Sequence, residues 1–248
     1  MSISSQASRV AIVTGGSGGI GRAVVQQLAR EGYAVVVGYA GNQTEADATV
    51  AGITSAGRQA AAVRADVADE IAVAAMFDEA EQTFGGVDVV VHAAAQMPLS
   101  PLAELDLGVL DGLIRTNIRG TFVVNQQAVR RLRAGGAIVN LSSSVVAIAR
   151  PSYSAYAASK GAVDALTLTL AHELRGRDVT VNAVAPGPTS TPMFLDGKNE
   201  QLVNRIAAEP PLERLGTPED SAELICFLAS RAGHWINGQV IRVNGGII

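Results

Sequence analysis

Seven short runs of β-branched and other apolar residues recur along the chain, and a longer amphipathic segment separates each run from the next. The runs are RVAIVT, YAVVVGY, AAAVRA, VDVVVHA, GAIVNLS, DVTVNAVA and QVIRV. Because they are almost continuously apolar, they are typical of parallel strands that helices cover on both faces. Repeated strand–helix–strand units predict an α/β fold, namely a doubly wound Rossmann-type sheet of about seven parallel strands.

The predicted elements form one domain. A chain of 248 residues that is 48% hydrophobic and 17% charged can bury a sizeable core, and no repeat, linker or low-complexity tract divides residues 1–248. The most irregular stretch is PGPTSTPMFLDGKNEQ at 186–201. We expect this stretch, within a substrate-loop region around 188–215, to form a mobile lid over the site.

Composition and charge indicate where in the cell the protein is expected and which classes of partner are disfavoured. A net charge of -4 and a pI near 5.4 give no general field that would attract nucleic acid or an anionic membrane. The start, MSISSQASRV, lacks the features of a secretory signal, and no segment approaches about 18 uninterrupted apolar residues. We therefore expect a cytoplasmic protein. Cys226 has no second cysteine to pair with and is expected to be a buried thiol.

Two segments carry helix signals. Thr217, Pro218 and Asp220 predict a helix start, with a cap, a first-turn proline and an acidic residue near the positive end. After the first strand, apolar residues recur at helical spacing and predict a stripe that packs on the sheet. This stripe consists of Ile20, Ala23, Val24 and Leu28.

A glycine-rich segment, TGGSGGIG from Thr14 to Gly21, directly follows the first predicted strand and opens the first predicted helix. In this position the backbone amides and the positive end of the helix can hold a pyrophosphate. Gly19 and Gly21 are the candidates for close approach to that group. The segment alone also fits a tight strand-to-helix turn without a ligand, so other motifs must decide between the two interpretations.

The end of the second predicted strand bears on the choice of nucleotide. A carboxylate about 20 residues beyond the glycine segment usually holds the ribose of NAD, but Tyr39 stands there and GYAGNQT has no acidic residue before Glu45. Without a negative charge a 2′-phosphate is favoured, so we predict NADP(H) over NAD(H). GYAGNQT has no basic residue either. Asn42, Thr44 and backbone amides would bind the phosphate, and Arg22 would help only if its side chain turns toward it.

Tyr156 and Lys160 in YAASK lie four residues apart at the start of a largely apolar predicted helix, so they share one helix face. An ammonium about 5 Å from a phenol contributes roughly 3 kcal/mol at an effective dielectric near 20, which is on the order of two pKa units. We therefore expect Lys160 to lower the pKa of Tyr156 so that the phenol can exchange a proton with a substrate oxygen. The spacing alone is common and needs support from the rest of the chain.

Taken together, these segments resemble the short-chain dehydrogenase/reductase family, and the resemblance runs from Arg9 to the C-terminus. TGGSGGIG resembles the cofactor loop TGxxxGxG, YAASK resembles YxxxK, and IVNLSSS resembles the strand end that carries the family's serine. That serine usually lies about 13 positions before the tyrosine, which implies Ser143, with Ser142 and Ser144 as alternatives. Asn117 in RTNIRGTF matches the family's structural asparagine, which holds a water that links the lysine to solvent.

The resemblance also implies the remaining site residues. APGPTSTPM resembles the PG motif that contacts the nicotinamide end of the cofactor, and RADVAD carries the pair beside the adenine. The implied catalytic residues are Asn117, Ser143, Tyr156 and Lys160, and no metal is expected. The implied cofactor-binding residues are Gly15, Ser17, Gly19, Ile20, Gly21, Tyr39, Ala40, Asn42, Asp66, Val67, Ala93, Ala94, Tyr156, Lys160, Pro186, Gly187 and Thr189.

One segment departs from the family pattern. After the fourth predicted strand the family has NNAG, whereas this chain has His92, Ala93, Ala94 and Ala95. The loss of asparagine at Ala93 removes hydrogen bonds that steady the central sheet, and Ala95 narrows the space beside the cofactor. We interpret His92 as a strand-end residue. The three histidines, at 92, 172 and 234, are isolated and have no carboxylate cluster, so they do not predict a metal site.

The resemblance implies an NAD(P)H-dependent oxidoreductase that interconverts a carbonyl and a secondary alcohol. The cofactor would supply hydride, Ser143 would bind the carbonyl oxygen, Tyr156 would act as general acid/base, and Lys160 would bind the nicotinamide ribose. The pattern is most similar to NADPH-dependent 3-oxoacyl-carrier-protein and ketone reductases. An NAD-dependent sugar or secondary-alcohol dehydrogenase is the alternative. A non-catalytic nucleotide-sensing regulator, from another class, would not need these side chains.

Other segments bear on substrate and partners. The sequence MFL at 193–195 either lines an apolar pocket for a small-molecule substrate or packs the loop onto the domain. Arg130, Arg131 and Arg133 form either a basic patch for a substrate carrier protein or a solvated helix end. INGQVIRVNGGII resembles the tail through which family members form tetramers, so a homotetramer or dimer is expected. Alternatively, this apolar tail packs within its own subunit.

Overall fold

Seven strands form one parallel sheet in the order β3-β2-β1-β4-β5-β6-β7. The computed structural model describes residues 8–248. Most of MSISSQASRV, in which we expected no secretory signal, therefore lies outside the described residues. Each strand falls on one of the seven predicted runs, and the predicted doubly wound Rossmann-type fold is confirmed. The strands are β1 (Val10–Thr14), β2 (Ala34–Tyr39), β3 (Ala60–Arg64), β4 (Val89–His92), β5 (Gly136–Leu141), β6 (Val179–Pro186) and β7 (Val240–Val243).

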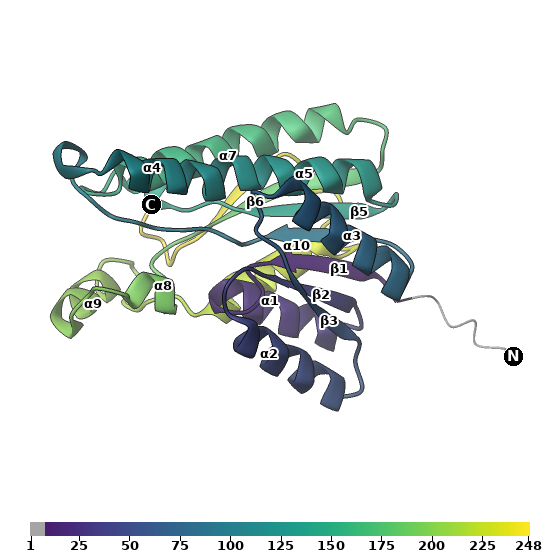
Figure 1. Cartoon of the computed structure of the whole chain (residues 1–248). Helices are drawn as coiled ribbons and strands as arrows, with labels where there is room; N and C mark the ends of the chain where they lie inside the picture. The colour runs from purple at the N-terminus through teal and green to yellow at the C-terminus, as the bar shows by residue number, and fades with distance from the viewer. Residues whose placement is uncertain (1–7) are drawn as a thin grey trace, which may run out of the picture.

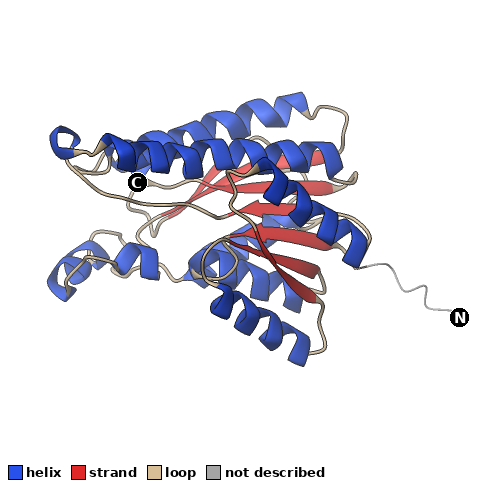
Figure 2. Cartoon of the chain, in the orientation of Figure 1, coloured by secondary structure: helices blue, strands red, loops and turns tan. Residues whose placement is uncertain are grey.

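Helices cover both faces of the sheet (Figures 1 and 2). The first face is covered by α1 (Gly19–Arg30), α2 (Gln43–Ser55) and α10 (Pro218–Ala229), and the second by α3 (Glu70–Phe84), α5 (Gly120–Arg131) and α7 (Ser154–Glu173). The shorter elements lie near the carboxyl ends of the strands. These are the 3-10 turn η1 (Leu102–Glu104), α4 (Leu107–Leu113), the π-helical turn η2 (Ile114–Arg119), α6 (Val145–Ile148), α8 (Pro192–Leu195) and α9 (Glu200–Ala207).

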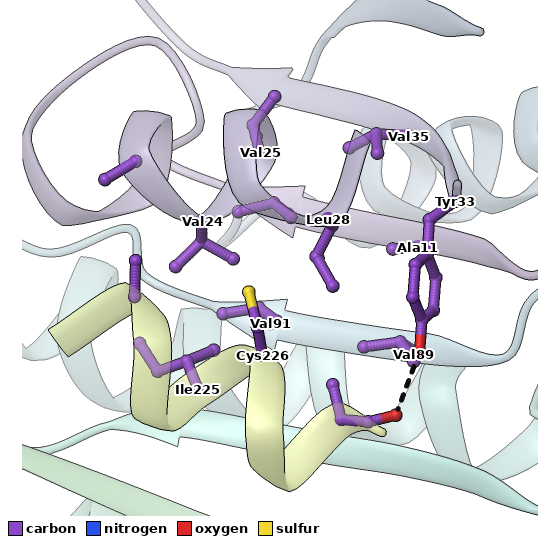
Figure 3. Packing of buried hydrophobic residues seen from close by; sticks show 14 of the residues in the cluster. Ala11, Val24, Val25, Leu28, Tyr33, Val35, Val89, Val91, Ile225 and Cys226 are labelled. Carbon is purple, nitrogen blue, oxygen red and sulfur yellow. Dashed lines mark hydrogen bonds between the residues drawn. The ribbon is translucent and has the colours of Figure 1, made fainter. Parts of the chain in front are cut away.

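On the first face, α1 and α10 pack against each other and against the central strands (Figure 3). Val24 and Leu28 are fully buried, as the predicted stripe required, and they lie beside Ile225 of α10. Cys226 is 1% exposed, which confirms the buried thiol, and burial raises its pKa. The chain therefore holds α1, and the glycine turn before it, on a tightly packed apolar layer.

On the second face, a buried polar chain fixes α5 and α7 to the sheet. The Asn125 amide donates to Asn140 Oδ1 of β5 at 2.9 Å, and the Asn140 amide donates to Thr167 Oγ1 of α7 at 3.1 Å. These groups are all buried, so each hydrogen bond satisfies a polar atom that water cannot reach. These hydrogen-bonded side chains thereby set the position of α7 relative to the end of β5.

The helix start predicted at Thr217 is confirmed. Thr217 Oγ1 accepts from the Asp220 amide, Asp220 accepts from the Thr217 amide at 2.6 Å, and Pro218 occupies the first turn. Hydrogen bonds from Arg214 lower the pKa of Asp220 to about 2. This capping box ties the end of the 188–215 region to α10.

The stretch at 186–201 is less irregular than predicted. Thr191 caps the short helix α8 by accepting a hydrogen bond from the Phe194 amide, with Pro192 at the first position. Asn199 caps α9 in the same way. Figure 1 shows these two helices projecting from the carboxyl edge of the sheet. Among the described residues, 8–248, no helix combines the length and apolar character needed to cross a membrane.

Candidate active site

A cleft of about 860 Å³ lies along the carboxyl edge of the sheet. The strand order reverses between β1 and β4, and open α/β sheets bind ligands at this reversal. All residues predicted to bind the cofactor line this cleft: Gly15, Ser17, Gly19, Ile20, Gly21, Tyr39, Ala40, Asn42, Asp66, Val67, Ala93, Ala94, Tyr156, Lys160, Pro186, Gly187 and Thr189.

The glycine turn has a shape that larger residues could not adopt. Gly15 has a φ of +67°, and a Cβ there would lie 2.9 Å from the Ala94 nitrogen. A Cβ on Gly21 would lie 2.2 Å from the Gly15 oxygen, so this glycine lets the first turn of α1 pack on the glycine turn. Gly19 has a φ of +51°, a conformation that favours glycine, and its close approach to a pyrophosphate stays a prediction.

The turn leaves an anion site open. Gly18 is the N-cap of α1 and provides no side-chain hydrogen bond to the first-turn amides. Those amides and the positive helix end face the cleft lining, where a pyrophosphate can bind. The uncapped helix end, the tight glycine contacts and the volume of the cleft together fit a dinucleotide.

Asp66, which was predicted to lie beside the adenine, is held by hydrogen bonds from its neighbours. Asp66 Oδ1 accepts from the Ala68 amide at 2.9 Å, and Oδ2 accepts from Arg115 at 2.6 Å. Burial works against ionisation of this carboxyl, but the two hydrogen bonds outweigh it and lower the pKa of Asp66. Asp66 is therefore a fixed carboxylate acceptor beside Val67.

Ion pairs along the cleft escaped prediction. Each arginine that lines the cleft within the described residues contacts a carboxylate. The partners lie 23, 49 and 59 residues apart, so no local pattern could have revealed them. The pairs are Arg22–Glu45, Arg115–Asp66 and Arg150–Glu209.

Tyr156 and Lys160 lie one turn apart on α7, as predicted, and both line the cleft at the end of β5. They are 8% and 4% exposed, respectively. Lys160 Nζ donates to the Leu141 carbonyl at 2.7 Å and lies 5.8 Å from the centre of the Tyr156 ring. The backbone of β5 thus fixes the ammonium beside the phenol.

The expected lowering of the Tyr156 pKa is wrong for this structure. Burial raises the pKa of Tyr156 to about 12, although a hydrogen bond with Ser143 acts in the lowering direction. Burial also lowers the pKa of Lys160 to about 8, while the charge of Asp164 opposes that change. Removing both groups from water disfavours both charged forms, and this desolvation exceeds the attraction we considered.

The serine predicted at position 143 is the one that faces the tyrosine. The Ser144 hydroxyl donates to the Ala185 carbonyl at 3.0 Å and accepts from Asn244 at 3.1 Å, so it joins β6 to the C-terminal segment. Ser142 Oγ is buried and has no partner in the described part of the chain. Ser143 is half-buried in the cleft, where its Oγ accepts from the Val145 amide at 3.3 Å, and its contact with a substrate oxygen stays a prediction.

Asn117 lies behind the cleft and does not line it, unlike the other predicted catalytic residues. The π-helical turn η2 carries it. Its amide group donates to the Gln96 carbonyl at 2.9 Å and to Ser159 Oγ at 3.0 Å, and its Oδ1 accepts from the Gln96 amide at 2.8 Å. The side chain therefore ties the loop after β4 to α7, and a role in holding water stays a prediction.

His92 compensates for part of the departure from NNAG. Its Nδ1 lies 2.8 Å from Thr14 Oγ1, so a side-chain hydrogen bond joins β4 to β1 where we expected bonds to be lost. The Ala94 amide also donates to Thr14 Oγ1, at 3.3 Å. Burial and the nearby charge of Lys160 lower the pKa of His92 to about 3, so the imidazole is neutral. The interpretation of His92 as a strand-end residue agrees with this placement.

The substrate end of the cleft is mostly apolar. Met193 and Phe194 line it, whereas Leu195 does not, so the MFL segment both lines the pocket and faces outward. Ala149 and Ser152, on the loop beside the pocket, have φ values of +53° and +69°, which is unusual for residues other than glycine. Sequence reasoning missed the other lining side chains here: Gln96, Met97, Val145, Ile148, Arg150, Tyr153 and Ile206.

The arginine run consists of Arg130 and Arg131 in the last turn of α5 and Arg133 just after it, and none of them lines the cleft. Arg133 contacts Asp88, which immediately precedes β4, and the Asp88 carboxylate also accepts from the Val10 amide at 2.7 Å. Arg131 pairs with Asp78 at 2.5 Å. The contact of Arg133 lies at the amino ends of the strands, opposite the cleft, and Arg130 and Arg133 are exposed, so the run agrees with the solvated helix end and not with a basic patch beside the cleft.

Comparison with known proteins agrees with this geometry. The family model described as enoyl-(acyl carrier protein) reductase matches residues 15–248. An NADPH-dependent aldehyde reductase-like chloroplastic protein of Arabidopsis thaliana is 41% identical, over 98% of this chain and 95% of its own. The 3-oxoacyl-[acyl-carrier-protein] reductase of Staphylococcus aureus is 40% identical, over 97% and 98%. A short-chain dehydrogenase from Burkholderia cenocepacia, solved with NADP, superposes with a TM-score of 0.91 at 37% identity, over 98% of each chain.

Proposed function

The chain belongs to the short-chain dehydrogenase/reductase family, and we propose that it is an NADPH-dependent reductase of neutral, largely apolar ketones or aldehydes. One observation carries the proposal. Ser143, Tyr156 and Lys160 meet in the same cleft whose other end is formed by the glycine turn. A carbonyl compound held at these side chains therefore lies in the cleft that fits the dinucleotide.

The side chains supply the proton and hold the reacting oxygen. NADPH, when bound, supplies hydride to the carbonyl carbon. Ser143 donates a hydrogen bond to the carbonyl oxygen, and Tyr156 donates its phenolic proton as negative charge develops there. A pKa of about 12 keeps the phenol protonated near neutral pH, as a general acid must be. The Lys160 ammonium, fixed by the Leu141 carbonyl, stabilises the phenolate that forms.

Several observations support NADPH over NADH. The end of β2 presents Tyr39 where an NAD site usually has a carboxylate. The Arabidopsis relative is named as NADPH-dependent, and the Burkholderia structure contains NADP. The physiological direction would then be reduction, because cells keep NADPH in excess over NADP.

The lining of the substrate end supports the proposed substrate class. Its side chains include Met97, Ile148 and Phe194, and the charge of Arg150 is neutralised by Glu209. An apolar carbonyl compound buries its surface favourably there, whereas a sugar would place hydroxyls against these apolar side chains. Because the Staphylococcus relative is named as a 3-oxoacyl-[acyl-carrier-protein] reductase, 3-oxoacyl thioesters should be assayed first among long-chain substrates.

Replacement of Tyr156 with Phe tests the proposal. Tyr156→Phe should reduce the rate of NADPH-dependent ketone reduction by at least about 100-fold, since general acid catalysis contributes that much, and it should leave NADPH affinity nearly unchanged. Tyr33→Phe is the matched control, because Tyr33 is a buried tyrosine outside the cleft. Turnover of Tyr156→Phe at the parent rate would refute the assignment. Nucleotide binding without turnover of any carbonyl or alcohol by the parent would favour a regulator.

We also propose that the chain forms a homotetramer or a homodimer. Phe122 on α5, Leu168 on α7 and Phe227 on α10 are each more than 40% exposed, and Trp235 is 99% exposed. Large exposed apolar side chains on helices of both faces support two contact surfaces. Light scattering after size-exclusion chromatography measures the mass, and a monomer at micromolar concentration would contradict this proposal. A cytoplasmic location, expected from the sequence, is likewise proposed and can be tested by cell fractionation.

A further inference from the structure

We propose that Arg22 selects NADPH by binding its 2′-phosphate, and that Glu45 is the counter-ion that Arg22 exchanges for this phosphate. This inference rests on the proposed function, because it assigns a residue to the choice of nucleotide at the same site. It resolves the difficulty that GYAGNQT contains no basic residue that could meet the phosphate.

The ion pair is located where the ribose end of a dinucleotide would lie. Arg22 belongs to the start of α1, four positions after Gly18, and Glu45 belongs to the first turn of α2. Arg22 Nη1 lies 2.9 Å from Glu45 Oε2, and both residues line the cleft beside Tyr39 and Asn42. The pair thus bridges the glycine turn and the segment after β2, which flank the ribose in folds of this type.

The other cations of the cleft are committed elsewhere. Arg115 pairs with Asp66, and Arg150 pairs with Glu209 at the substrate end. Lys160 Nζ donates to the backbone beside Tyr156. Arg64 does not line the cleft, and its Nε donates to the Ala40 carbonyl. Arg22 is therefore the cleft arginine that borders the turn after β2.

The exposure of the pair makes the exchange feasible. The two side chains are 45% and 46% exposed, and an ion pair in that setting is weakly held. A phosphate carries more charge than one carboxylate and accepts two parallel hydrogen bonds from the planar guanidinium. NADH has no such group, so Arg22 stays with Glu45 when NADH binds. Arg22 should accordingly add affinity for NADPH alone.

The first experiment measures dissociation constants for NADPH and NADH by fluorescence titration. Arg22→Gln should weaken NADPH binding about tenfold or more, the range for loss of a charge-assisted bidentate contact, and change NADH binding less than about twofold. Arg30→Gln is the control, because it removes the same charge from the far end of the same helix. An equal loss for both nucleotides, or an unchanged NADPH affinity, would overturn the proposal.

Glu45→Gln tests the counter-ion. It should tighten NADPH binding several-fold in the parent, because Arg22 no longer has to leave a carboxylate, and it should have no such effect in Arg22→Gln. Equal tightening in both backgrounds would mean that Glu45 acts by general repulsion, which would refute the exchange. Failure of the proposed function looks different, because in that case the parent would bind neither nucleotide or would turn over no carbonyl compound.

Discussion

His92 and Thr14 join the carboxyl ends of β4 and β1 through a buried side-chain hydrogen bond of 2.8 Å. His92 Nε2 has no partner among residues 8–248, so the imidazole rests on this one contact within the described chain. Protonation would place a second charge near Lys160 at a buried position. The imidazole of His92 is therefore neutral in the folded protein.

This relationship predicts a loss of stability in acid. The pKa of His92 is about 3 in the fold against an ordinary value of 6.5, so between these values the unfolded chain binds the proton and the folded chain does not. The free energy of unfolding should fall by up to about 1.4 kcal/mol per pH unit as the pH drops below 6.5. Urea unfolding at pH 7, 6 and 5 measures this slope.

The variant His92→Asn separates this contribution from those of other groups. Asparagine can still hydrogen-bond Thr14 but cannot titrate, so the variant should lose less stability than the parent between pH 7 and pH 5. Parallel pH profiles for the two proteins would show that His92 does not contribute.

Lys160 is expected to cost stability while serving catalysis. Burial lowers its pKa to about 8, so between pH 8 and its ordinary value of 10.5 the unfolded chain binds more protons and stability rises with pH. Below pH 8 the folded state bears the full cost of the buried charge. Lys160→Met should therefore be more stable at pH 7 by about 1–2 kcal/mol, after allowing for the Leu141 carbonyl left unpaired, and should lose activity. Thermal unfolding combined with assays checks both outcomes, and a destabilised variant would be contrary to the expectation.

The glycine turn predicts a contrast between neighbouring substitutions. Gly21→Ala would place a Cβ 2.2 Å from the Gly15 oxygen, whereas a Cβ on Gly18 meets nothing within 4 Å. Gly21→Ala should destabilise the nucleotide-free protein by about 1–3 kcal/mol, and Gly18→Ala by less than about 1 kcal/mol. Chemical denaturation of the two variants tests this, and a loss as small for Gly21→Ala as for Gly18→Ala would show that the turn tolerates a side chain at both positions.

The pair between Arg150 and Glu209 connects the loop after β5 to the residues that follow α9. The pair is partly exposed, and its loss should cost no more than about 1 kcal/mol. We predict that Glu209→Gln raises KM for an apolar ketone up to about fivefold and leaves kcat unchanged, because α9 would close less firmly over the pocket. Glu200→Gln, an exposed change at the start of α9, is the control. A drop in kcat with KM unchanged would place the pair in the chemical step instead.

The fold was predictable because its signals are local. Each strand is a short apolar run, and the Thr217 cap and the α1 stripe can be read from residues a few positions apart. The cofactor end of the cleft was predictable because its segments resemble family motifs that follow parallel strands, and the ends of such strands meet at one edge of the sheet. The lining of the substrate end was not predictable in this way. The π-helical turn that carries Asn117 was not predictable, since its extra residue per turn leaves no separate pattern in RTNIRGTF.

Contacts between segments that are distant in sequence limited how much of the site could be predicted. The cleft ion pairs join residues that are far apart in sequence, so neither composition nor spacing predicts them. The protonation of Tyr156 was misjudged for a related reason. The attraction to Lys160 can be calculated from helix geometry, but the burial that raises the pKa of Tyr156 depends on everything that packs around it.

The sheet order also bears on synthesis of the chain. Strand β1 pairs with β2 on one side and with β4 on the other, where Ala11 lies opposite Val89. A ribosome releases β1, β2 and β3 well before β4, so for that interval the nascent chain carries an apolar strand with one edge uncovered. Such an edge can pair with another chain. A pause in translation just before residue 89 emerges would prolong this interval and favour aggregation of this protein.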